Sequence, residues 1–118
     1  MPEAETTALW RPVGPAELRQ IEAAGMRGFP PRLPDQPIFY PVLSQDYAAK
    51  IARDWNVPAH GAGHVTRFFV RKDFLANYPI REAGGGAHRE YWIPAEDLPD
   101  FNAAIVGAIE VVESFPEP

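Results

Sequence analysis

The sequence predicts an α+β domain of mostly antiparallel, twisted sheets with short flanking helices. Three observations predict this class. Segments of strand and helix character are mixed without the strict alternation of a parallel βαβ sheet. The 118 residues fit one domain with one core. The 14 prolines are scattered among apolar segments, so they mark boundaries between short elements rather than a low-complexity tract.

The N-terminal part of the chain predicts a strand followed by a helix. Residues 8–13 (ALWRPV) are rich in β-preferring side chains and end at a turn signal, which predicts a short strand. Pro15 suits the first position of a helix because it has no amide hydrogen to leave unpaired, and Gly25 supplies a left-handed stop. We therefore expect a helix over 15–24, followed by a structured, proline-rich loop over 26–36.

The best-marked unit is a strand that leads directly into a helix. Residues 37–43 (PIFYPVL) are β-preferring, and the proline inside this run indicates an edge or a bulge. Ser44 stands at the N-cap position of the helix, where a serine stabilises by about 1 kcal/mol without any further role. Tyr47, Ile51 and Trp55 recur every four residues and predict one buried stripe.

The second half of the chain predicts strands separated by short helical pieces. The expected elements are a loop at 56–64, a strand at 65–71, one helical turn at 73–78, a strand at 88–93, a helix at 98–105 and a last strand at 109–112. Because side chains alternate along a strand, His88, Glu90 and Trp92 are expected on one face.

A single domain is expected over 8–113, with flexible tails at 1–7 and 114–118. Large apolar side chains on the inward faces of the predicted elements form the expected core. These are Trp10, Leu18, Ile21, Phe39, Ile51, Phe68, Val70, Trp92, Phe101 and Ile109.

Composition limits the classes of partner and chemistry. Sixteen acidic against eleven basic residues give a net charge of −5, which opposes non-specific binding to nucleic acid or anionic membrane. Without cysteine the chain has no disulfide framework, thiolate nucleophile or thiolate zinc site. No apolar run reaches the roughly 20 residues that span a bilayer, and the N-terminus does not have the pattern of a signal peptide. We therefore expect a cytoplasmic protein with neither nucleic acid nor membrane as partner.

Three side chains are candidates for chemistry, and each has a simpler alternative. The planar fork of Arg11 suits a phosphate or a carboxylate, although an arginine on an edge strand commonly pairs with a surface acid. Glu90, between aromatic residues, could stabilise positive charge developing on a sugar, or pair with a neighbouring base. Tyr40 could stack on a flat ring or offer its hydroxyl, or simply pack in the core.

Two further signals are weak. His60 and His64 are spaced i, i+4, but the glycines between them make a helix improbable and no third ligand is marked, so we expect no metal site. Gly84–Gly86 has neither the dinucleotide-binding pattern nor the phosphate-loop pattern.

The order of the segments resembles the N-terminal and C-terminal halves of ADP-ribosyltransferase-like toxins and their small bacterial relatives. The residues that carry this resemblance are Leu9-Trp10-Arg11, the helix with Glu17, Leu18 and Ile21, Gly25 with Phe29, Ile38-Phe39-Tyr40 leading to Ser44, Ala48 and Ala52, and GGGAHRE at 84–90. Over roughly 8–112 the chain is also similar to small bacterial proteins labelled ADP-ribosylation/crystallin J1, through RPVGPAEL, FPPRLPDQPIFYPVL, ARDWN and EYWIPAEDL.

The resemblance implies roles for particular residues. Arg11 matches a first-strand arginine that helps to hold the dinucleotide, and Glu90 matches the glutamate that contacts the nicotinamide ribose. His88 stands where the family has Glu or Gln to select the acceptor. The family's Ser-Thr-Ser run is replaced by 40–44 (YPVLS), so Tyr40 or Ser44 takes its role, or the site is degenerate.

The resemblance further implies that NAD+ is a substrate, bound by Arg11, Tyr40, Ser44 and Tyr47, with no metal required. Glu90, Arg11 and His88 would serve cleavage of the nicotinamide–ribose bond and transfer of ADP-ribose. The acceptor would be a protein side chain, a small molecule or water. The alternative function is a catalytically inactive module of the same fold that binds a nucleotide or a protein.

Overall fold

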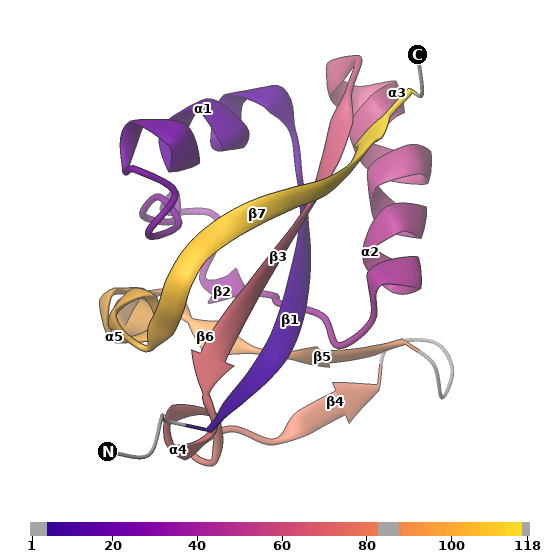
Figure 1. The fold of residues 1–118 in the computed structure, drawn as a ribbon. Coiled ribbons are helices and arrows are strands. Elements are labelled where there is room, and N and C mark those ends of the chain that lie inside the picture. The colour runs from indigo at the N-terminus through magenta and orange to yellow at the C-terminus, as the bar shows by residue number, and fades with distance from the viewer. Residues whose placement is uncertain (1–4, 83–87, 117–118) are drawn as a thin grey trace.

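A three-stranded antiparallel sheet in the order β1–β3–β7 forms the centre of the molecule (Figure 1). The computed structural model describes residues 5–82 and 88–116. Strand β3 (Gly63–Arg71) lies between β1 (Thr6–Val13) and β7 (Ile105–Phe115). Strand structure thus extends into both segments that were predicted to be flexible tails.

Two smaller antiparallel sheets complete the β-structure. Strand β2 (Ile38–Phe39) pairs with β6 (Ile93–Pro94), and β4 (Ile80–Glu82) pairs with β5 (Arg89–Tyr91). The predicted strand at 88–93 is therefore two strands with different partners, and β4 was not predicted. The molecule is a mixed α/β domain with antiparallel sheets and short helices, as the sequence predicts.

The predicted strand at 37–43 is shorter than expected because prolines interrupt its hydrogen bonding. After β2, Val42 forms isolated bridges to Trp10 on one side and to Glu90 on the other. The amide of Trp10 donates to the carbonyl of Val42 (2.9 Å), and the amide of Val42 donates back (2.8 Å). Val42 therefore joins β1 to β5, and it brings the neighbourhoods of Arg11 and Glu90 together.

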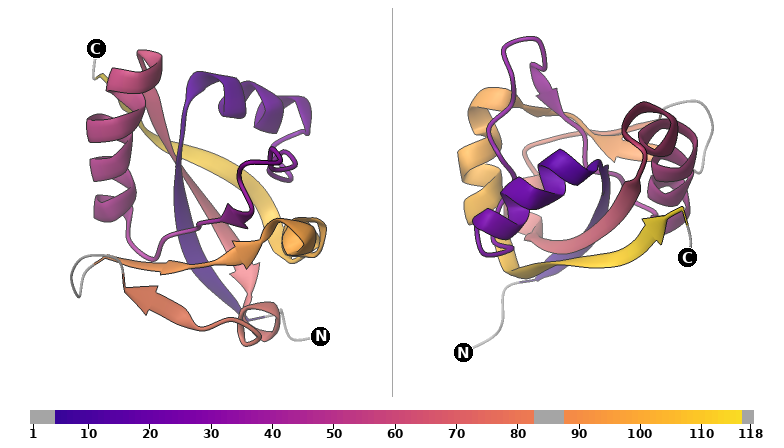
Figure 2. Two further views of the ribbon diagram at one scale, coloured as in Figure 1. Left: turned by 180° about the vertical axis from the view of Figure 1, so that it is seen from behind. Right: turned by 90° about the horizontal axis from the view of Figure 1, so that it is seen from above.

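Helix α1 (Pro15–Ala23) follows the prediction, and Gly25 adopts a left-handed conformation (φ 69°) after it. Helix α2 (Gln45–Ile51) also begins as predicted, with Ser44 as its N-cap. The two helices lie on either side of β1 (Figures 1 and 2).

The loop predicted at 56–64 is wrong. Helix α2 continues through a π-helical segment, η1 (Ala52–Asn56), into α3 (Val57–His60), which ends at the left-handed Gly61 (φ 83°). Pro58 directly follows the π-helical segment, at the start of α3, and the helix continues past it.

The remaining helices are short. They are α4 (Lys72–Leu75), the 3₁₀ helix η2 (Ala95–Asp97) and α5 (Leu98–Ala103). The predicted helix at 98–105 ends two residues early, and the last strand begins at Ile105 rather than at residue 109. None of the helices in the described part of the chain is long and apolar enough to cross a membrane.

The main core packs aromatic rings between the central sheet and the elements that cover it. Phe39, Phe68 and Phe101 are fully buried, and their rings meet edge to face at 5.1 Å and 6.0 Å. Of the predicted core residues, the fully buried ones are Ile21, Phe39, Phe68, Val70, Phe101 and Ile109, and those only partly buried are Trp10, Leu18 and Ile51. The prediction for Trp92 is wrong, because its side chain is 41% exposed at a pocket.

Candidate functional site

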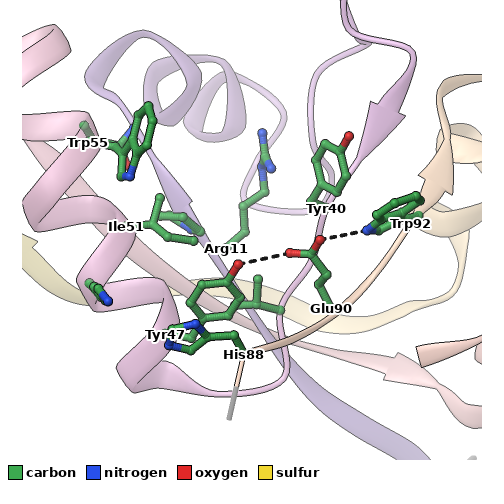
Figure 3. Close-up of a pocket in the computed structure, with 12 residues that line it drawn as sticks. Arg11, Tyr40, Tyr47, Ile51, Trp55, His88, Glu90 and Trp92 are labelled. Atoms are coloured by element: carbon green, nitrogen blue, oxygen red, sulfur yellow. Dashed lines mark hydrogen bonds between the residues drawn. The ribbon is translucent and has the colours of Figure 1, made fainter. Parts of the chain in front are cut away.

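A pocket of about 760 Å³ opens between α2 with η1 on one side and the strand that carries Glu90 on the other (Figure 3). Its floor includes residues of β1 and the Val42 bridge. The lining consists of Arg11, Pro12, Tyr40, Val42, Tyr47, Lys50, Ile51, Trp55, Asn56, His88, Glu90 and Trp92. The sequence-predicted residues Arg11, Tyr40, Tyr47, His88 and Glu90 are among them.

Glu90 is the buried carboxylate of this pocket, with 8% of its surface exposed. The indole N–H of Trp92 donates to Oε1 (2.7 Å), and the hydroxyl of Tyr47 donates to Oε2 (3.2 Å). These two donors fix the orientation of the carboxylate. Because a carboxylate oxygen can accept two hydrogen bonds, Glu90 can still accept one from a ligand hydroxyl.

Tyr47 and His88 form a stacked pair beside Glu90. Their ring centroids are 4.4 Å apart and their planes differ by 9°. Burial, followed by the charge of Glu90 and its hydrogen bond, raises the pKa of Tyr47. Tyr47 therefore remains a protonated donor at neutral pH, and His88 is held at the pocket by its contact with that ring.

The opposite wall is also aromatic. Tyr40 meets Trp92 edge to face at 6.0 Å, and the guanidinium of Arg81 lies 4.4 Å from the centre of the Trp92 ring. Trp55, on the η1 side, is 73% exposed. The predicted buried stripe of Tyr47, Ile51 and Trp55 thus lines a pocket instead of the core. The buried side of the same helix carries Ala48, Ala49 and Ala52.

The guanidinium of Arg11 is paired with Glu17. Its Nε donates to Oε2 of Glu17 (2.7 Å) and its Nη2 donates to Oε1 (3.0 Å), and it lies 4.6 Å from the centre of the Phe39 ring. Figure 3 shows this group turned away from the Glu90 carboxylate. Arg11 and Glu90 therefore line one pocket, as predicted. The guanidinium of Arg11 is nevertheless paired with the acid Glu17, which agrees with the alternative in which this arginine forms an ion pair within the protein.

Ser44 serves as a helix cap. Its hydroxyl oxygen accepts the amide of Tyr47 (3.1 Å), and Ser44 is absent from the described lining of the pocket. Its predicted contact with a dinucleotide stays a prediction.

Sequence reasoning missed three contributions to the site. Trp92 was assigned to the core, although its spacing of two from Glu90 already placed both on one strand face. Glu17 lies six residues from Arg11, across the junction of a strand and a helix, so no local spacing indicated their pairing. Trp55 carried the signal of a buried residue, because a pocket wall and a core have the same periodicity.

The described residues contain no group of three or more His, Asp or Glu side chains placed to hold a metal ion. Nδ1 of His64 lies 2.8 Å from the hydroxyl of Ser114. His60, at the end of α3, faces Gly14. Gly84–Gly86 lie outside the described residues.

The pocket therefore offers a carboxylate oriented by two hydrogen bonds, between aromatic walls, together with the cationic side chain of Lys50. Comparisons of the chain with protein-family models, with curated proteins and with solved structures gave no match.

Proposed function

We propose that the protein is an ADP-ribosyltransferase-like domain that binds NAD+, or a related nucleotide, and cleaves the bond between nicotinamide and ribose. The observation that carries the proposal is the buried Glu90 carboxylate, held by Tyr47 and Trp92 in a pocket of about 760 Å³. Ligand sites are commonly about 300–1,000 Å³, lined by aromatic side chains with a few placed polar groups.

Among the described residues of the lining are the carboxylate of Glu90 and the cations Arg11 and Lys50, and we propose that a cationic ring lies beside the carboxylate. The nicotinamide ring of NAD+ is flat and carries a positive charge. The faces of tryptophan and tyrosine attract cations, and Tyr40, Trp92 and Glu90 surround one part of the pocket. A neutral or anionic ring gains less from this arrangement than a pyridinium ring does.

In the proposed reaction the C1′–N bond breaks and its electron pair leaves with nicotinamide, which becomes neutral. Positive charge develops on the ribose. Glu90 accepts a hydrogen bond from the ribose 2′-hydroxyl and stabilises this charge, and its two donors fix it before the reaction begins. The acceptor then forms a bond to C1′ and loses its proton to solvent.

His88 and Arg11 have supporting roles in this proposal. His88, held against Tyr47, orients the acceptor, which is a protein side chain, a small molecule or water. Arg11 contributes positive charge on the side of the ligand's phosphate groups, while its donors remain on Glu17.

The second candidate is a binding module of the same fold that does not turn over its ligand. The pairing of Arg11 with Glu17 favours it, because the fork of this arginine is already filled by a carboxylate of the chain. Tyr40 in place of the family's Ser-Thr-Ser run also favours it.

Incubation with NAD+ and measurement of released nicotinamide separate the two functions. Glu90→Gln is the sharpest variant, because the amide keeps an acceptor for Trp92 and can donate to the oxygen of Tyr47. We expect Glu90→Gln to lower the rate by about 100-fold or more, the usual effect of removing one electrostatic group. Glu96→Gln, an exposed position outside the pocket lining, is the matched control.

Binding is measured separately through tryptophan fluorescence, because Trp55 and Trp92 line the pocket. Saturable NAD+ binding without nicotinamide release from the wild-type protein supports the binding module. Equal release from the wild-type protein and from folded Glu90→Gln contradicts the enzyme. Absence of both NAD+ binding and nicotinamide release contradicts the enzyme and contradicts a module that binds NAD+.

A further inference from the structure

A second hollow of about 680 Å³ adjoins the pocket, and Arg11, Pro12 and Asn56 line both. Among the described residues that line it are three arginines, at 11, 19 and 32, and one carboxylate, that of Glu17. The whole chain carries a net charge of −5. Positive charge is therefore concentrated in this hollow, although the net charge of the whole protein is negative.

Arg32 is a buried cation of this hollow, and its ion pair is longer than that of Arg11. Its side chain is 10% exposed, and its Nη1 is 3.9 Å from Oε1 of Glu17, the carboxylate that already holds Arg11. Within the described part of the chain, Nε of Arg32 has no hydrogen-bond partner. Burial, together with the positive charge of Arg11, lowers the pKa of Arg32. A buried guanidinium in this situation gains from an added anion.

Arg11 is less able than Arg32 to take up that anion. Two of its donors are engaged by Glu17 at 2.7 Å and 3.0 Å, in the paired geometry that arginine and a carboxylate favour. A ligand phosphate would have to break both bonds to use them. At Arg32 it would have to displace only a contact of 3.9 Å.

Two further features of the hollow point to a polar ligand. Helix α1 has nine residues and no side-chain cap, and Gly14, Pro15 and Ala16 at its start line the hollow. The free amides of a first helical turn favour an anion. Independently, Oδ1 of Asn56 is buried without a partner in the described residues, and Asn56 lies on the shared boundary with the first pocket.

We infer that the second hollow binds the phosphate groups of the ligand, and that Arg32 with the first turn of α1, rather than Arg11, holds them. Oδ1 of Asn56 then accepts a hydrogen bond from a hydroxyl of the ligand, at the point where the ligand passes from one hollow to the other. The Arg11–Glu17 pair stays intact as a wall between them. This inference rests on the proposed function for the identity of the ligand as a nucleotide, but a phosphate probe tests it separately.

The net negative charge of the chain does not prevent this binding. In about 0.1 M salt, charges farther than about 10 Å from the phosphate are largely screened. The arginines line the hollow itself, so local charge decides the affinity.

The test is a titration of the full ¹⁵N-labelled chain with inorganic pyrophosphate, followed by NMR. We expect saturable shifts of the Arg32 Nε–H resonance and of the amides of Ala16 and Glu17. Arg32→Gln should weaken binding at least tenfold. Arg53→Gln should leave it unchanged, because the side chain of Arg53 is 57% exposed, paired with Asp54 and outside the lining of the hollow.

The inference is overturned if folded Arg32→Gln binds pyrophosphate with unaltered affinity. It is also overturned if Arg11→Gln abolishes pyrophosphate binding and Arg32→Gln does not. Failure of pyrophosphate to saturate the wild-type protein overturns it as well. If Arg32→Gln does not fold, the response of the wild-type Arg32 Nε–H resonance decides. Pyrophosphate binding at Arg32 without nicotinamide release from NAD+ supports this inference while the enzyme proposal fails. If folded Arg32→Gln releases nicotinamide from NAD+ at the wild-type rate, the enzyme proposal is supported while this inference fails.

Discussion

The pair between Arg11 and Glu17 makes a quantitative prediction about stability. Glu17→Gln keeps the size of the side chain but removes the negative charge between Arg11 and Arg32. The two side chains of the pair are 11% and 20% exposed, so water replaces the lost interaction only in part. Hydrogen bonds to charged groups contribute about 1.5–3 kcal/mol each, and glutamine keeps one acceptor for Arg11. We therefore expect the free energy of unfolding to fall by about 2 kcal/mol.

This loss converts into a change in melting temperature. Unfolding entropy near 60 °C is about 2.1 cal/mol/K per residue, or roughly 0.25 kcal/mol/K for this chain, so Glu17→Gln should melt about 8 °C below the wild type. The matched control is Glu110→Gln, which breaks the exposed pair of Glu110 with Arg67 (3.3 Å). An exposed pair contributes about 0–1 kcal/mol, so its melting temperature should change by at most about 4 °C.

Thermal and urea unfolding of the three proteins, at low and at high salt, measure both effects. Added salt should erase most of the small effect of Glu110→Gln and little of the effect of Glu17→Gln, because buried pairs are screened less. Equal losses in the two variants would refute the reasoning. In that case the Arg11–Glu17 pair would behave as a surface pair, and Arg11 would be free to bind a ligand.

Three other predictions concern pH, packing and the site. Burial and the hydrogen bond to Asp97 raise the pKa of Tyr78 from 10.0 to about 12, so the stability this group adds is complete below about pH 10 and is lost between pH 10 and 12. Urea unfolding should show the difference between wild type and Tyr78→Phe constant up to pH 9 and shrinking above pH 10. In Gly63→Ala the new Cβ would lie 2.6 Å from the carbonyl oxygen of Ala52, and calorimetry should show a loss of about 1–3 kcal/mol. Folded Glu90→Gln should melt within about 3 °C of the wild type or above it, because it removes a buried charge but keeps the hydrogen bonds. A much lower melting temperature would assign Glu90 a structural role.

Elements with local start and stop signals could be predicted from the sequence. Pro15 and Gly25 bound α1, and Ser44 caps α2, because these signals act within one helical turn. Elements defined by distant partners could not be predicted. Strand β4 exists because it pairs with β5, and the run at 88–93 divides because its two parts pair with different strands.

The candidate site was predictable in part for the same reason. Alternation along a strand placed Glu90 and Trp92 on one face, and the structure confirms that both line the pocket. The partner of Arg11 depends on the angle between β1 and α1, which no spacing in the sequence encodes. Arg32 was not singled out, because it stands in a proline-rich loop whose path only the folded chain defines.

Periodicity also cannot distinguish the wall of a pocket from the core, since both require apolar side chains on an inward face. Here the two faces of one helical segment separate the cases. Its small residues Ala48, Ala49 and Ala52 pack against the sheet, whereas Tyr47 and Trp55 face the pocket. The exposed parts of these rings add little to the stability of the fold, and the carboxylate they approach is costly to bury. Partly exposed aromatic side chains around one oriented carboxylate are therefore better explained by the binding of a ligand than by the stability of the fold.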